Sequence, residues 1–188
     1  MPLGTISTAN AEQYGWEDNI VQFSSARGRG TNEPVWSDMG NGHYNFLFTL
    51  NDELFATYHV KHDYKLGTNG HPHVHFLVTE TMTAGQQITW RFGYTIAKGH
   101  QQGESLTGAE TIIDMTYTAT GLEIPGEHII LECSDEQSFD QREPDTLISG
   151  RFELISENVT GDIFGILGDL HYQTDRHGTL NKAPDFYT

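Results

Sequence analysis

The sequence predicts an all-β protein, an antiparallel β-sandwich of about eight strands with a jelly-roll-like arrangement. Short runs of aromatic and β-branched residues recur at fairly even spacing from Trp36 onward, separated by Gly, Asn, Asp and Pro. No stretch has the 3.6-residue period of an amphipathic helix. Eight short strands without helices between them imply two antiparallel sheets packed face to face, and another sandwich topology stays open.

The two ends of the chain lack this alternation. Residues 1–35 are polar and contain glycine, with Arg27 and Arg29 in "ARGRGTNEP". We therefore expect an extended N-terminal arm over 1–35, a sandwich domain over 36–173 and a C-terminal tail over 174–188.

The strands are predicted from two-residue periodicity. In "QQITWRFGYTIAK", five large apolar residues alternate with smaller or polar ones from Ile88 to Ile96, which is typical of a half-buried strand. The other expected strands span residues 44–50, 53–60, 71–79, 110–119, 127–133, 146–155 and 163–173.

Charge and composition exclude several classes of function. With 10 Lys and Arg against 26 Asp and Glu, the formal net charge is −16, which argues against binding to nucleic acid or to acidic membranes. The single cysteine, Cys133, excludes an internal disulfide and a thiolate zinc site. No run approaches the ~20 apolar residues that cross a bilayer, and we expect synthesis in a cytoplasm.

The segment "HPHVH" carries the main candidate chemistry. In a strand, His71, His73 and His75 share one face, where neutral imidazoles suit Zn, Fe, Ni or Mn. The alternatives are a polar sheet face or subunit contact without metal, and a structural metal shared between subunits. Further along, Asp169 and His171 share strand parity, so that Asp169 could orient a ligating histidine.

The string "GTNGHPHVHFLVTE" is similar to the first motif of the cupins, a double-stranded jelly-roll family. Gly67, His73, His75 and Glu80 fill the motif's places, and "EIPGEH" offers His128 as a further ligand. The resemblance implies a metalloenzyme built on those three histidines and Glu80. The chain departs from the pattern because the proline and glycine of "EIPGEH" are adjacent. Glu80 also has the opposite strand parity to the histidines, so it reaches the same ion only across a bulge.

Several separated segments resemble a second family, small structural proteins encoded in tailed-bacteriophage genomes. The family pattern has a His-Asp-Tyr-Lys-x-Gly turn, a Pro-His-x-His strand, a Trp strand and a closing Asp-x-His-Tyr-Gln segment before a basic and aromatic tail. These places correspond here to His62–Gly67, Pro72–His75, Trp90–Tyr94 and Asp169–Gln173. The strand "EPDTLISGRF" also fits, and the resemblance covers roughly residues 27–188.

This resemblance implies a virion structural protein without catalysis or cofactor, made in the bacterial host cytoplasm. The leading expectation is a capsid cement or decoration protein on the capsid surface, a homotrimer that binds the major capsid protein. A tail, adaptor or baseplate component is the alternative, and the cupin-like metalloenzyme is the second. The residues expected at interfaces are Arg27, Arg29, His71, His73, His75, Phe186 and Tyr187.

Overall fold

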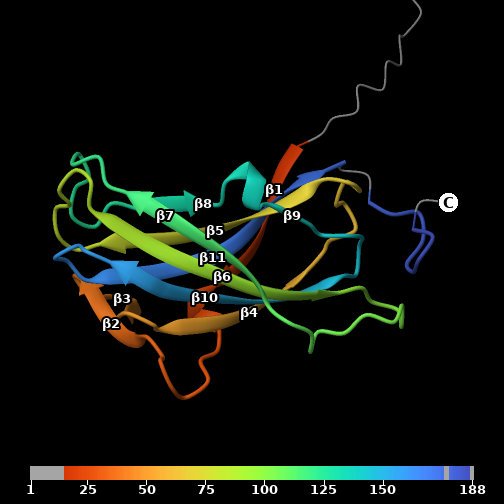
Figure 1. Cartoon of the computed structure of the whole chain (residues 1–188), viewed down its shortest axis with the longest axis horizontal. Helices are drawn as coiled ribbons and strands as arrows, with labels where there is room; N and C mark the ends of the chain where they lie inside the picture. The colour runs from red at the N-terminus through yellow and green to blue at the C-terminus, as the bar shows by residue number, and fades with distance from the viewer. Residues whose placement is uncertain (1–14, 176–177, 187–188) are drawn as a thin grey trace, which may run out of the picture.

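The computed structural model describes residues 15–175 and 178–186, and they form a β-sandwich of two antiparallel sheets (Figure 1). The expected fold class is confirmed, with eleven strands instead of eight. The strands are β1 (Gly15–Gln22), β2 (Val35–Gly40), β3 (His43–Phe48), β4 (Glu53–His59), β5 (Asn69–Val78), β6 (Gln87–Ala97), β7 (Thr111–Thr118), β8 (Ile129–Glu132), β9 (Phe139–Asp140), β10 (Leu147–Glu157) and β11 (Ile163–Thr174). Two short 3-10 helices, η1 (Phe23–Ser25) and η2 (Asp135–Gln137), lie between strands. None of the helices in the described part is long and apolar enough to cross a membrane.

The pairing of the strands explains the architecture. Each of the eight expected runs contains a strand, and these strands pair as β3 with β11, β4 with β10, β5 with β8 and β6 with β7. The four antiparallel pairs lie alternately in the larger and the smaller sheet, in the order of the chain. This is the jelly-roll arrangement. The larger sheet has the order β2-β3-β11-β5-β8, and the smaller sheet has the order β4-β10-β6-β7.

Strands β5 and β11 form the centre of the larger sheet. They pair antiparallel from His71 opposite His171 to Val78 opposite Ile163. The other edge of β11 pairs with β3 near Ile163 and with β1 from Leu167 to Thr174. Residues from both halves of the chain therefore meet on one sheet.

Part of the expected N-terminal arm is a strand in this sheet. Gly15–Gln22 form β1, paired with β11 along its whole length, and the following Phe23 is fully buried in the core. The alternation in β1 is short and lies within a polar stretch, and its partner strand lies at the other end of the chain. Local periodicity therefore gave no sign of the strand.

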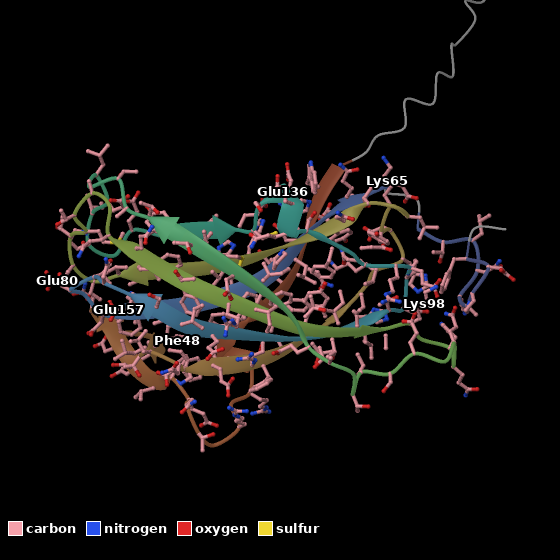
Figure 2. The ribbon with its side chains drawn as sticks, in the orientation of Figure 1. Phe48, Lys65, Glu80, Lys98, Glu136 and Glu157 are labelled. Carbon is pink, nitrogen blue, oxygen red and sulfur yellow. The ribbon has the colours of Figure 1, made fainter. Side chains whose placement is uncertain are left out.

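Aromatic side chains dominate the core between the sheets; Figure 2 shows side chains filling the space between the two sheets. The largest fully buried ones include Trp90, Tyr58, Tyr64, Tyr172, Phe23, Phe76, Phe92, Phe152 and Phe164. The backbone of β11 approaches these rings closely: a Cβ added at Gly168 would lie 2.3 Å from a ring carbon of Phe152. Glycine is required there because any side chain would overlap the core.

The described part of the C-terminal tail folds against the sandwich. Phe186 is only 4% exposed, and its ring meets the ring of His62 edge-on at 5.7 Å between centroids. Phe186 is therefore covered by its own chain and does not lie on the surface as the interface hypothesis requires. Tyr187, the neighbouring interface candidate, lies outside the described residues.

Candidate metal centre

The three histidines of "HPHVH" lie on the outer face of the larger sheet. Val74 and Phe76 of the same strand are fully buried in the core, so that the alternate residues His71, His73 and His75 point away from it. The prediction that the imidazoles share one face of a strand is confirmed.

The register of β11 places an acid and a fourth histidine beside them. Asp169 lies opposite His73, and His171 lies opposite His71. These pairs lie on the outer face, where the side chains of opposed residues approach one another. The sequence identified Asp169 and His171 as sharing a face but did not show which strand would lie next to them.

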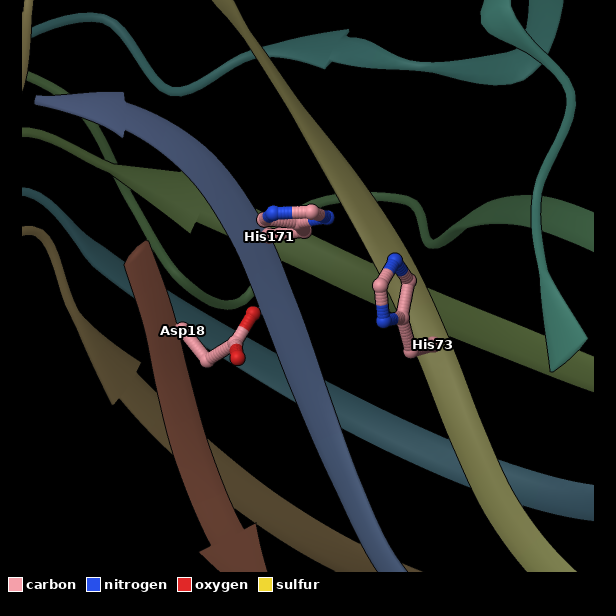
Figure 3. Close-up of side chains that lie close together, drawn as sticks. All are labelled: Asp18, His73 and His171. Atoms are coloured by element: carbon pink, nitrogen blue, oxygen red, sulfur yellow. The ribbon is translucent and has the colours of Figure 1, made fainter. Parts of the chain in front are cut away.

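The neighbouring strands add two more carboxylates to this face. Glu132 of β8 lies opposite His73, and Asp18 of β1 lies opposite His171. In Figure 3, β11 passes between β1 and β5, and Asp18, His171 and His73 lie close together from three adjacent strands. Sequence analysis missed Glu132 and Asp18 as site residues, because only the pairing of distant strands brings them here.

His73 lies between two carboxylates. Its Nδ1 is 3.2 Å from Asp169 Oδ1, and its Nε2 contacts Glu132 Oε2. The side chains of His73 and Asp169 are 9% and 2% exposed, so both groups are shielded from water.

His75 approaches the same carboxylate from its other side. Its Nε2 is 3.2 Å from Asp169 Oδ2, and its Nδ1 is 2.8 Å from Nε2 of His128. Its side chain is 12% exposed. Two of these buried atoms, His75 Nε2 and Asp169 Oδ1, have no hydrogen-bond partner among residues 15–175 and 178–186.

Burial and the neighbouring charges set the pKa values of this site. Burial by itself raises the pKa of Asp169, but His73 and His75 outweigh it and lower the pKa to about 2. Burial lowers the pKa of His73, yet Asp169 and Glu132 outweigh it and raise that pKa above its usual value. The pKa of Glu132 is lowered, because His73 and His171 outweigh its desolvation. Asp169 is therefore a carboxylate throughout the neutral range.

Two sets of three side chains on this face have ligand atoms close enough to hold a metal ion. One atom from each of His73, His75 and Asp169 lies within 4.8 Å of the others, and the same holds for Asp18, His73 and His171. The sets share His73. They differ in burial, since Asp18 is exposed whereas Asp169 is buried.

The ligand set implied by the cupin resemblance is only partly brought together. His73 and His75 are adjacent on one face, and the ring of His128 lies 5.0 Å from that of His75. Glu80 follows the end of β5 and lies at the far left of the molecule in Figure 2. The two strand histidines also point away from the interior, which is filled by aromatic rings.

The other interface candidates lie in different places. Arg27 is exposed, and its backbone pairs with Phe55 of β4. Arg29 is exposed but its Nε lies 2.5 Å from Oε1 of the buried Glu53. His71 is buried beside the ring of Trp16, which meets it edge-on at 5.6 Å between centroids.

A second group of histidines surrounds Asp145 near the tail. Asp145 Oδ1 lies 3.0 Å from His62 Nε2 and 3.1 Å from His59 Nε2, while Oδ2 lies 2.7 Å from His100 Nε2. The contacts to His62 and His100 have hydrogen-bond geometry, unlike those of Asp169. This cluster is therefore satisfied within the protein.

Comparison with known proteins gives no family assignment: no family model matches the chain, and no curated protein matches it. The function is therefore inferred from the residues and their geometry.

Proposed function

We propose that this chain is a non-enzymatic structural protein of a bacteriophage virion. In this proposal it is a cement or decoration protein that lies on the capsid surface and binds the major capsid protein as a homotrimer. The observation that carries the proposal is that the segments resembling the phage family are contiguous in space.

The segments meet around the centre of the larger sheet. Pro72 of the Pro-His-x-His strand lies opposite Leu170 of the closing segment. The turn at 62–67 is joined to the same segment, because Lys65 N–H donates to the Gln173 carbonyl at 2.8 Å and Tyr172 O–H donates to Asp63 at 3.0 Å.

The tryptophan strand faces these segments across the core. The ring of Trp90 on β6 lies 6.0 Å from that of Phe76 on β5, measured between centroids. Segments that are far apart in the sequence thus form one structural unit. A resemblance in all of them concerns a whole folded unit, which supports kinship with the phage proteins more strongly than isolated matches do.

The outer face of the larger sheet supplies a surface for a partner. Trp16, Ile20 and Ile130 are each about half exposed, at 51%, 53% and 54%. Ile20 lies opposite Asp169 and Ile130 lies opposite His75, so apolar side chains border the histidine cluster on both sides. Exposed apolar side chains around a buried polar centre are suited to a protein interface.

The decisive experiment is quantitative mass spectrometry of purified particles of the phage that encodes this chain. We expect about one copy per major capsid protein, with a trimer in solution by light scattering. A dozen or fewer copies per particle would replace the cement role with a tail, adaptor or baseplate role. Absence from the particle would overturn the proposal.

A further inference from the structure

We infer that His73, His75 and Asp169 bind one divalent first-row transition metal ion, such as Zn²⁺, on the outer face of the larger sheet. Two imidazoles and one carboxylate are a donor set that suits Zn, Fe, Mn, Co or Ni. The inference goes beyond the proposed function and does not depend on it, because it concerns only the chemistry of these side chains.

The first argument is that the donors are buried and unsatisfied. Asp169 Oδ1 and His75 Nε2 have no hydrogen-bond partner in the described part of the chain, although Asp169 is 2% exposed. Leaving such atoms without a partner costs free energy, and a bound cation satisfies both at once. Asp169 Oδ1 faces Nδ1 of His73, and His75 Nε2 faces the other oxygen of the same carboxylate, so both unpartnered atoms belong to the contacts between Asp169 and the two imidazoles.

The second argument is that the opposite nitrogen of each imidazole already has a partner. His73 Nε2 contacts Glu132 Oε2, which leaves Nδ1 toward Asp169. His75 Nδ1 is 2.8 Å from His128 Nε2, which leaves Nε2 toward Asp169. Metal-ligating histidines almost always hold their second nitrogen in this way, because it fixes the tautomer and orients the ring.

The third argument is the spacing of the donor atoms. Each ring nitrogen lies 3.2 Å from an oxygen of Asp169. With metal–ligand bonds of about 2.1 Å, a separation of this size subtends roughly 100° at the ion. That angle lies between the ~90° of octahedral and the ~109° of tetrahedral coordination.

The Asp145 cluster shows what a carboxylate among histidines looks like without need of an ion. There the imidazoles of His62 and His100 form hydrogen bonds with the carboxylate at 3.0 and 2.7 Å. No metal-ligand set among the described residues includes Asp145. The difference lies in the orientation of the rings and not in the residue types.

The alternative set of Asp18, His73 and His171 is less suitable. Asp18 is exposed on β1, and Nδ1 of His171 lies 3.2 Å from Glu132 Oε2. Both sets use His73, so one experiment with variants outside His73 distinguishes them.

An ion at the inferred site joins the two central strands of the larger sheet. His73 and His75 belong to β5 and Asp169 to β11. The set found among the described residues supplies three protein donors, so further coordination positions are left for water or a partner's side chain. We therefore expect metal binding to stabilise the fold.

The test uses the full chain without a polyhistidine tag, treated with chelator and then dialysed against Zn²⁺ or Co²⁺. We expect one ion per chain by elemental analysis, visible absorption bands of protein-bound Co²⁺, and a rise in Tm of about 5–10 °C at a hundredfold excess of Zn²⁺ over its Kd. Asp169→Asn and His75→Ala should each lose the ion, with the fold checked by circular dichroism.

Two control variants keep the test specific. His62→Ala removes a histidine from the Asp145 cluster, and His171→Ala removes one from the alternative set. Both should keep one ion per chain. The inference is overturned if the wild-type chain retains no ion, if His75→Ala and Asp169→Asn keep it, or if His171→Ala alone loses it.

Discussion

The two sheets of the sandwich carry charged side chains on their outer faces, and the two groups are satisfied differently. On the smaller sheet, Arg151 lies among Glu53, Glu110 and Glu153, with Nη1 3.1 Å from Glu53 and Nη2 2.8 Å from Glu110. On the larger sheet, two imidazoles approach Asp169 without forming a hydrogen bond with it.

The difference between the two faces follows from the hydrogen-bonding groups of arginine and histidine. A guanidinium has five N–H donors and no lone pair, so one Arg can bind several carboxylates and cannot ligate a metal. An imidazole that donates from one nitrogen has a lone pair on the other. On the smaller sheet, carboxylates therefore hydrogen-bond to Arg151, although Oε1 of the buried Glu53 has no hydrogen-bond partner in the described part of the chain. On the larger sheet, the two imidazoles approach Asp169 without a hydrogen bond.

The largest effect is expected when the network around Arg151 loses this cation. Arg151→Met should lower the free energy of unfolding by about 2–4 kcal/mol, because it leaves the buried Glu53 and two neighbouring carboxylates with less positive charge. Urea denaturation at pH 7 measures this.

A second arginine on the same face provides the control for the stability loss in Arg151→Met. Arg91→Met removes an ion pair with Asp114 in which both side chains are about a third exposed or more, and should cost less than about 1 kcal/mol. Equal losses in the Arg91 and Arg151 variants would mean that the Arg151 network contributes no more than a surface pair.

The second prediction concerns Asp145, a carboxylate whose histidine neighbours do form hydrogen bonds. Burial raises the pKa of Asp145, but His100, His62 and His59 outweigh it and lower that pKa below the usual 3.8. Its contribution to stability is therefore present above pH 3.8 and lost as the pH falls through the lower folded-state value. Asp145→Asn should cost about 1 kcal/mol at pH 6, and the difference from wild type should disappear near pH 2.

The backbone conformation of Asp145 does not disfavour asparagine, so the substitution tests the charge of the side chain without straining the backbone. Asp145 has a φ of 63°, a left-handed conformation that asparagine adopts as readily as aspartate. Asp135→Asn, at a side chain that is 97% exposed, is the control and should change the free energy of unfolding by less than about 0.5 kcal/mol. A loss at Asp145 that is the same at pH 2 and pH 6 would show that charge is not its cause.

The contrast between the two outer faces also shows what a sequence can predict. Alternation within eight separate runs of the sequence was enough to place eight strands, and the alternation in "HPHVH" was enough to assign the histidines to one face. The pairing of Asp169 with His73, and of Arg151 with Glu53 and Glu110, depends on register between strands that are distant in the chain. Nothing local encodes this register.

The same limit explains why local periodicity gave no sign of β1 and why Glu80 is not beside the histidines. Phe23 lies in a polar stretch, and its burial depends on β1 pairing with β11. Glu80 is close to the histidines in sequence, but it lies beyond the end of the extended strand β5 and therefore away from them. Asp169, which does lie beside the histidines, belongs to the last strand, β11.

The smallest effect on stability is expected at the apolar border of the histidine cluster. Ile130→Ser should change the free energy of unfolding by less than about 0.5 kcal/mol, because the side chain is half exposed.

If this face binds the capsid, the same substitution should weaken cosedimentation with particles at least tenfold. Ile112→Ser, at an exposed isoleucine on β7 of the smaller sheet, is the matched control and should leave binding unchanged. Since Ile130 is no metal ligand, the variant should keep its ion, so a loss of particle binding would be assigned to the apolar contact. Equal binding by both variants would exclude the outer face of the larger sheet as the contact surface.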